Sequence, residues 1–129
     1  MLSSLIELEN LTTYKINTNF LENITKTLSS NYIELIICNN DYIKKINLAH
    51  RSIDTATDVL SFPYTNEFNI PDLPLGSILI SIDFVTKKAK ELNHSTDDEL
   101  TLLFIHGLLH LLGFDHEIDN GEHREKEQK

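Results

Sequence analysis

Residues 95–116, STDDELTLLFIHGLLHLLGFDH, carry the strongest structural signal in the sequence. Ser95 is a typical helix-capping residue, and Asp98 follows three positions later, in a pattern that resembles a capping box with Asp in place of Glu. From Leu100 to Phe114 the chain has no Asp, Glu, Lys or Arg, but this stretch is shorter than the ~20 apolar residues of a membrane-spanning helix. We therefore predict a long, largely buried helix over Thr96–Leu112 that does not cross a membrane.

Upstream of this helix, β-rich apolar runs alternate with segments of helical periodicity. We predict four strands, over Leu5–Glu9, Tyr32–Cys38, Thr57–Phe62 and Ser77–Ile82. We predict three further helices, over Asn17–Ser29, Asp41–Ala49 and Asp83–Leu92. This mixture favours an α+β fold, in which a mixed sheet of about four strands packs with about five helices and the histidine-bearing, zincin-like helix lies near the C-terminus.

Two of the predicted helices have a recognisable inner face. In the first, Phe20, Ile24 and Leu28 lie at spacing four, which is the apolar stripe of an amphipathic helix. In the second, Asp41 is a candidate N-cap. The residues of this second helix that we expect to face inward are Ile43, Ile46 and Leu48.

The chain has 129 residues, of which 40% are hydrophobic and 24% charged, and these values are typical of one globular domain. Because we find no internal repeat, low-complexity run or linker, we expect a single domain over residues 1–129, with the polar segment 117–129 frayed. The net charge of −9 argues against an electrostatic clamp on duplex nucleic acid, although it is compatible with a local basic spot.

The sequence predicts a cytoplasmic protein. The N-terminal residues, MLSSLIELEN, lack a positively charged region and include Glu7 and Glu9, so we expect no signal peptide. Cys38 is the only cysteine, which excludes an intramolecular disulfide and fits a reducing compartment.

Three histidines, His106, His110 and His116, form the candidate metal site. Residues four apart on a helix lie about 40° apart around its axis and ~6 Å apart along it, so His106 and His110 project in the same direction. His116 lies six positions further on, and a left-handed turn at Gly113 would bring it back toward the other two. Three imidazoles with an open position are typical of catalytic zinc, whereas a lone histidine in an apolar helix is more often a packed core residue.

The spacing H-x3-H-x2-G-x2-H is also that of the metzincin proteases. Those enzymes need a glutamate directly after the first histidine, because this glutamate acts as the general base on zinc-bound water. Here that position is Gly107, which has no side chain. A peptidase built on this motif would therefore lack its base.

The chain resembles the YbeY family of bacterial rRNA maturation factors in three blocks. Residues His106–His116, HGLLHLLGFDH, match the family signature HGxLHLxGxDH completely. Arg51 precedes Thr57–Pro63, TDVLSFP, as an arginine precedes T-D/N-V-L-S-F-P in the family. The third block is leucine-glycine-aspartate followed by a β-run, and it occurs here as Leu75–Ser81 with Ser77 in place of the aspartate. Since the blocks agree in order and approximate spacing, the likeness spans essentially the whole chain.

The resemblance implies a metal-dependent endoribonuclease that cuts single-stranded RNA and matures the 3′ end of small-subunit rRNA, with the ribosomal small subunit as its partner. By this resemblance His106, His110 and His116 hold one zinc ion with a water ligand, and neither an organic cofactor nor a membrane partner is implied. Arg51 and His106 are the catalytic residues in this interpretation. The planar, permanently charged guanidinium of Arg51 suits a scissile phosphate.

The roles of Arg51 and of the position of Ser77 both have alternatives. Arg51 could instead be a solvated loop residue or the ion-pair partner of Asp54. If the aspartate that Ser77 replaces orients a metal ligand, Asp58 or Asp115 could take over its role.

Two other functions share the histidine motif. One is a zinc hydrolase that acts on a peptide or a small ester, and the other is a non-catalytic ribosome assembly factor whose metal is structural. For the nuclease, attack by metal-activated water and attack by the RNA 2′-hydroxyl are both compatible with the sequence. Weaker candidates for RNA contacts are His50, Lys87, Lys88 and Lys90.

Overall fold

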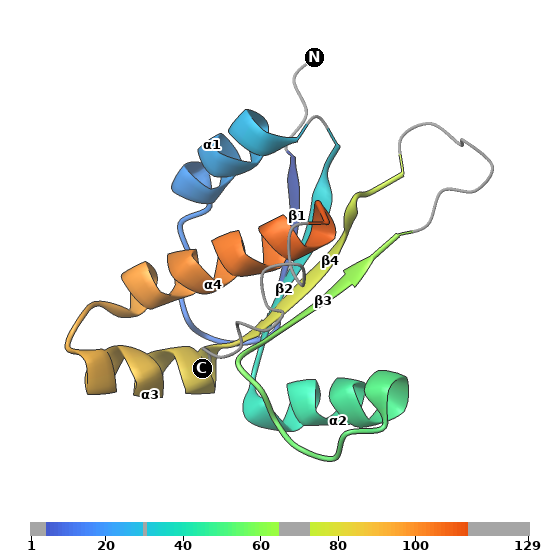
Figure 1. Cartoon of the computed structure of the whole chain (residues 1–129). Helices are drawn as coiled ribbons and strands as arrows, with labels where there is room; N and C mark the ends of the chain where they lie inside the picture. Colours follow the sequence, from blue (N-terminus) through green and yellow to red (C-terminus); the bar gives the residue numbers. More distant parts are fainter. Residues whose placement is uncertain (1–4, 30, 65–72, 114–129) are drawn as a thin grey trace, which may run out of the picture.

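The computed structural model describes residues 5–29, 31–64 and 73–113 (Figure 1). Its strands form one four-stranded sheet in the order β1-β2-β4-β3. The strands are β1 (Ile6–Asn10), β2 (Ile33–Cys38), β3 (Val59–Pro63) and β4 (Gly76–Ser81). The helices of the described residues are α1 (Asn19–Leu28), α2 (Asn40–Arg51), α3 (Ile82–Leu92) and α4 (Thr96–Leu111). Because β1, β2 and β4 are parallel and β3 is antiparallel to β4, the sheet is mixed and β3 is an edge strand.

The two inner strands are covered on both faces. The buried apolar side chains form two clusters, a larger one that includes Phe104 and Leu108 of α4, and a smaller one made of Cys38, Ile43, Leu60 and Leu79. In β4, Ile78 and Ile80 lie in the larger cluster, whereas Leu79 between them lies in the smaller one. The same alternation in β2 assigns Ile37 to the larger cluster and Cys38 to the smaller one. This double burial explains why both strands are nearly continuous apolar runs rather than alternating ones.

The helices lie on opposite faces of the sheet (Figure 1). Helices α1, α3 and α4 contribute to the larger core cluster, whereas α2 contributes Ile43 to the smaller one. Phe104 and Leu108 of α4 have no exposed surface, so α4 is the helix that fills the centre of the larger cluster. The fold prediction of a mixed sheet packed with helices is confirmed, although the described residues contain four helices rather than about five.

Helix α4 starts at Thr96, as its sequence predicts, and ends at Leu111, one residue before the predicted end. The Ser95 side chain accepts a hydrogen bond from the Asp98 backbone N–H at 3.0 Å, which confirms the N-cap. At the other end, the N–H of Gly113 donates to the carbonyl of His110 at 3.0 Å, and Gly113 has a positive φ of 91°. A glycine reaches this conformation without strain, so the chain can leave the helix axis at this point.

Two glycines bring α4 close to the sheet. A Cβ on Gly107 of α4 would lie 3.0 Å from the Cγ2 atom of Ile78 in β4. A Cβ on Gly76 of β4 would lie 2.5 Å from the carbonyl oxygen of Phe62 and 2.6 Å from Cδ2 of Leu111 at the end of α4. The backbone of Gly107 therefore contacts the side chain of Ile78, and the backbone of Gly76 contacts the side chain of Leu111. Gly76 has no room for a side chain of its own.

Of the predicted inner face of α1, only Ile24 packs against the core, where it is partly buried. Phe20 and Leu28 are 61% and 42% exposed, whereas Leu21 and Thr25 are almost fully buried. Thr25 can lie on the inner face because its hydroxyl donates to the Leu21 carbonyl at 2.8 Å, which satisfies the buried polar group. The apolar pattern alone could not predict this arrangement.

Helix α2 also differs from its prediction. It begins at Asn40, one residue earlier, and its N-cap is Asn39, whose side chain accepts from the Tyr42 N–H at 2.9 Å. Leu48 is 48% exposed, because the neighbouring Asn47 takes the buried position and donates from its side chain to the Thr55 carbonyl at 3.0 Å. As in α1, a hydrogen-bonded polar side chain occupies the inner face.

Two further predictions concern the rest of the chain. Among the described residues, no helix combines the length and apolar character that crossing a membrane requires. The segment 117–129, expected to fray, and residues 65–72 of the proline-containing loop lie outside the described residues.

We predict that Gly76→Ala lowers the free energy of unfolding by about 1–3 kcal/mol, which is the usual cost of overpacking. The new methyl group would meet a backbone carbonyl oxygen, which cannot move away without breaking the pairing of β3 with β4. The measurement is equilibrium denaturant unfolding followed by circular dichroism.

Gly107→Ala is the matched control for this prediction. Its methyl group would meet only the flexible side chain of Ile78, and alanine favours helix by about 1 kcal/mol over glycine, so the two effects oppose each other. We expect a smaller change than for Gly76→Ala. A Gly76→Ala chain as stable as the wild type would contradict the close approach.

Candidate metal centre

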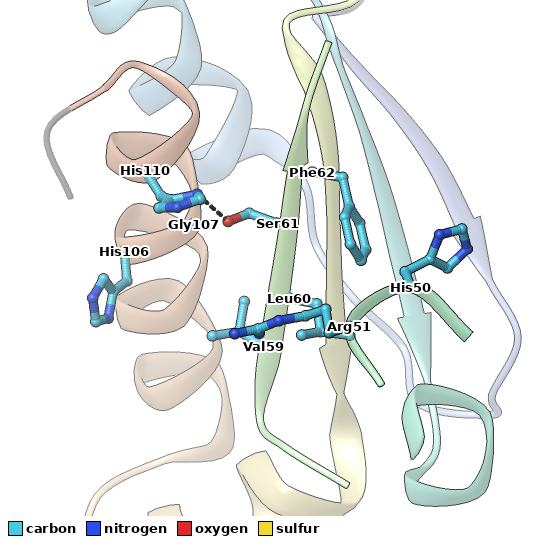
Figure 2. Close-up of a pocket in the computed structure, with 9 residues that line it drawn as sticks. All are labelled: His50, Arg51, Val59, Leu60, Ser61, Phe62, His106, Gly107 and His110. Carbon is cyan, nitrogen blue, oxygen red and sulfur yellow. Dashed lines mark hydrogen bonds between the residues drawn. The ribbon is translucent and has the colours of Figure 1, made fainter. Parts of the chain in front are cut away.

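A cavity of about 490 Å³ lies at the edge strand β3. Figure 2 shows it between α4 and the end of α2, with β3 crossing in between. Because the cavity opens around an edge strand, residues from both faces of the sheet reach it. The residues that line it are His50, Arg51, Val59, Leu60, Ser61, Phe62, His106, Gly107 and His110.

The alternation of β3 determines which side chain faces which helix. Leu60 and Phe62 pack in the smaller cluster with α2, whereas Val59 packs against the larger one. Ser61 therefore lies on the same face as Val59, toward α4. Its hydroxyl is 2.6 Å from Nδ1 of His110, which makes a hydrogen bond between the strand and the helix (Figure 2).

The histidines at positions 106 and 110 both line the cavity from adjacent turns of α4. His110 is half-buried and its ring points toward β3, where Ser61 bonds it. His106 is exposed, and in Figure 2 its ring is turned away from that of His110. The sequence predicts that these two side chains project in the same direction. Both line the cavity, but in Figure 2 their rings point in different directions.

The donor chemistry of this site fits an imidazole-bound metal ion. Nδ1 of His110 is engaged by a hydroxyl, so Nε2 is the nitrogen through which that ring would coordinate. An exposed side chain such as His106 changes rotamer on the ps–ns timescale, so its ring can follow an ion. The third predicted ligand, His116, lies outside the described residues, and within the described ranges no three His, Cys, Asp or Glu side chains gather as a metal site.

Arg51 reaches the cavity from the other side of β3. It is the last residue of α2, not a loop residue, and Ser52 ends the helix in the left-handed conformation with φ 59°. In Figure 2 its side chain extends across β3 in the direction of α4. Asp54, the alternative partner, instead lies 4.0 Å from Lys44, and no described carboxylate forms an ion pair with Arg51.

Neither Ser77, which replaces the family's aspartate, nor Asp58, a candidate to take over that aspartate's role, lines the cavity. Ser77 donates to Oε1 of Glu34 at 2.7 Å, across the pairing of β4 with β2, and does not line the cavity. Asp58 accepts from the Val59 N–H at 2.8 Å and also lies outside the cavity lining. Asp115 lies outside the described residues. The residue that contacts His110 is instead Ser61, which no local sequence pattern marks.

Gly107 bears on the peptidase alternative. A side chain at this position would point into Ile78 of β4, because its Cβ would lie 3.0 Å from that residue. Gly107 also lines the cavity, so its missing side chain leaves space both beside Ile78 and in the cavity. The argument against a peptidase remains the missing glutamate.

Cys38 does not belong to the site. It is fully buried in the smaller core cluster, and its thiol lies 3.6 Å from the carbonyl oxygen of Ile80. Burial, and to a smaller extent the Asp83 carboxylate, raises the pKa of the thiol to about 12. The thiolate, which is the form that binds metals and attacks electrophiles, is therefore scarce at neutral pH.

Comparisons with a family model, with curated proteins and with a solved structure each find a protein similar to nearly the whole chain. A family model described as Endoribonuclease YbeY matches residues 4–129. Endoribonuclease YbeY of Aliarcobacter butzleri is 60% identical over 126 residues, which cover 97% of this chain and 89% of that protein. Endoribonuclease YbeY of a Sulfurovum species is 50% identical, over 98% of this chain and 88% of its own. The solution structure of TM1509 from Thermotoga maritima superposes with a TM-score of 0.60 and 30% identity, over 95% of this chain and 84% of that one.

We predict that the native chain at pH 8 reacts with iodoacetamide at least about 100-fold more slowly than the chain unfolded in urea. The raised pKa and the burial of Cys38 both act in this direction. The measurement is the rate of mass increase by mass spectrometry, and adding zinc should leave it unchanged. Comparable rates in the native and unfolded chains would contradict the buried thiol.

Proposed function

The chain belongs to the YbeY family, and we propose on this basis that it is a metal-dependent endoribonuclease that cuts single-stranded RNA. The observation that carries the proposal is the convergence of His106, His110 and Arg51 on one cavity from two different helices. Two imidazoles for a metal ion and a guanidinium for a phosphate are the groups that hydrolysis of a phosphodiester requires.

In this proposal His106, His110 and His116 hold one zinc ion. When bound, the ion supplies Lewis acidity, which activates water near neutral pH and polarises a phosphoryl oxygen. The chain's own part is to hold the imidazoles in place and to leave the cavity open to substrate. The hydrogen bond of 2.6 Å between Ser61 and His110 supports this arrangement, because it orients one of the rings.

Arg51 binds the scissile phosphate in this proposal. Its guanidinium presents paired N–H donors that match two phosphate oxygens, and its charge offsets the negative charge that develops on them. Its exposure and its position at the end of a helix leave the side chain able to reach a ligand. The adjacent His50, whose ring centroid lies 5.5 Å from that of Phe62, lines the same cavity.

The physiological substrate in this proposal is the 3′ end of small-subunit rRNA, reached in the cytoplasm on the ribosomal small subunit. Two points support it: the likeness of the whole chain to the YbeY family, and the net charge of −9. A strongly acidic protein binds free RNA weakly, because the polyanion is repelled. Docking on a ribosomal particle would supply the affinity that the chain itself lacks.

Replacing Arg51 tests the phosphate-binding role. We expect Arg51→Ala to lower single-turnover cleavage of an unstructured RNA oligonucleotide by about 10²–10³-fold, as for loss of other groups that stabilise transition-state charge. Arg51→Lys should recover only part of the rate, because an ammonium lacks the planar fork. Zinc content, measured by inductively coupled plasma mass spectrometry, should be unchanged in both variants.

Lys44→Ala is the matched control, since Lys44 is also a cation on α2 but lies outside the cavity lining. We expect it to cleave at the wild-type rate. If Arg51→Ala cleaved as fast as Lys44→Ala, Arg51 would have no role in the reaction. Cleavage that persisted in both Arg51→Ala and His110→Ala would indicate a contaminating nuclease.

Removing the metal tests whether it is catalytic or structural. We expect a chelator to abolish RNA cleavage and to leave the far-ultraviolet circular dichroism unchanged, because the core is built from apolar side chains of the sheet and helices. Restoring zinc should restore cleavage. Unfolding on chelation, or a folded zinc-loaded protein that cuts no RNA, would favour an assembly factor with a structural metal.

The products identify the attacking group. Attack by the RNA 2′-hydroxyl requires that hydroxyl and leaves a 2′,3′-cyclic phosphate. Attack by water does not need the hydroxyl and leaves no cyclic phosphate. A substrate with one 2′-deoxynucleotide at the cleaved position separates the two routes. Turnover of peptides or small esters, with no cleavage of RNA, would instead favour the other class of hydrolase.

A further inference from the structure

We propose that Ser61 is a positioning residue that fixes the imidazole of His110 for metal coordination through Nε2. The inference rests on the proposed metal-dependent function and adds a residue to it. Ser61 lies in the middle of β3, on the face that α4 covers, and its hydroxyl is 2.6 Å from Nδ1 of His110. It lines the same cavity as both histidines (Figure 2).

A serine hydroxyl can donate or accept, so the direction of this bond is part of the proposal: we infer that the Ser61 oxygen accepts from Nδ1–H of His110. A neutral imidazole carries its proton on one nitrogen and a lone pair on the other, and only the nitrogen with the lone pair binds a metal. When Nδ1–H donates to the Ser61 oxygen, the lone pair is on Nε2. The bond also limits rotation of the ring, so the lone pair keeps one direction.

The strand and the helix are held at the distance that this bond needs. Ser61 pairs with Ile78 in the β3–β4 register, and Ile78 is also the residue against which Gly107 packs. The missing side chain at Gly107 lets α4 approach the sheet, and His110 follows one turn later on the same helix. The length of the hydrogen bond is therefore set by a packed contact and not by a flexible loop.

The same face of β3 provides no such support for His106. His106 is exposed, and within the described ranges no hydrogen bond to its ring is found. The two histidines thus differ: His110 is oriented before any ligand arrives, whereas His106 adjusts to it. Loss of the Ser61 hydroxyl should therefore weaken metal binding through His110.

Three variants test the inference. Ser61→Ala removes the hydroxyl and leaves the strand intact. Ser61→Thr keeps a hydroxyl on a residue that suits strands well. Ser77→Ala is the matched control, because Ser77 lies on the neighbouring strand and loses an equally short bond of 2.7 Å, to Glu34, away from the cavity.

The first readout is zinc affinity, measured by competition with a chromophoric chelator. We expect Ser61→Ala to bind zinc about 10–100-fold more weakly, the usual effect of removing a hydrogen bond to a metal ligand. Ser61→Thr should stay close to the wild type, and Ser77→Ala should equal it. All variants are first compared by denaturant unfolding, so that a general loss of stability is visible.

The second readout needs no metal. Long-range ¹H–¹⁵N NMR of the metal-free chain reports which nitrogen of His110 carries the proton. We expect the Nδ1–H form to predominate in the wild type and in Ser61→Thr, and its share to fall in Ser61→Ala. The ring of His106 should show no change among the variants.

Two different failures are distinguishable. A Ser61→Ala chain that binds zinc as tightly as the wild type and keeps the same His110 tautomer would overturn the role of Ser61, while zinc binding and RNA cleavage by the wild type would still support the proposed function. A wild-type chain that binds no zinc would overturn the proposed function and this inference together.

Discussion

Helix α4 packs closely on the sheet at two glycines, where a Cβ would crowd the opposite element. Gly107 rests against Ile78, and Gly76 lies under Leu111, where a Cβ would be only 2.6 Å from that side chain. This approach buries Phe104 and Leu108 completely and so stabilises the larger core through the hydrophobic effect. It also sets the height of the histidines above β3. The proposed site therefore depends on the same contact that holds the fold together.

The edge position of β3 has a second consequence for the site. An inner strand would separate the two faces of the sheet, whereas an edge strand lets a cavity open around its side. Arg51 from the α2 face and His110 from the α4 face consequently line one cavity, although their helices lie on opposite sides. The antiparallel pairing with β4 keeps Ser61 turned toward α4 and Phe62 toward α2. Strand β3 thus supplies side chains to the cavity both on the side toward α4 and on the side toward α2.

Local patterns predicted the elements, and tertiary contacts explain what they missed. The cap at Ser95 and the spacing of His106 and His110 are properties of one helix, so the sequence was sufficient for both. The inner face of α1 was misjudged because Thr25 satisfies its own hydroxyl, and hydropathy assigns a threonine to the outside. Ser61 was overlooked because its partner is 49 residues away, and no local pattern reveals which helix covers a strand.

The acidity of the chain is physically compatible with the proposed role of Arg51 in phosphate binding. Interactions between exposed charges are largely screened beyond about 8 Å at physiological ionic strength, so a net charge of −9 spread over the surface does not fix the field inside one cavity. There the local groups dominate, and Arg51 forms no ion pair with a described carboxylate. The overall charge instead discourages binding to RNA elsewhere on the surface. Under the proposed function, such a protein engages RNA at the cavity, where Arg51 can contact a phosphate.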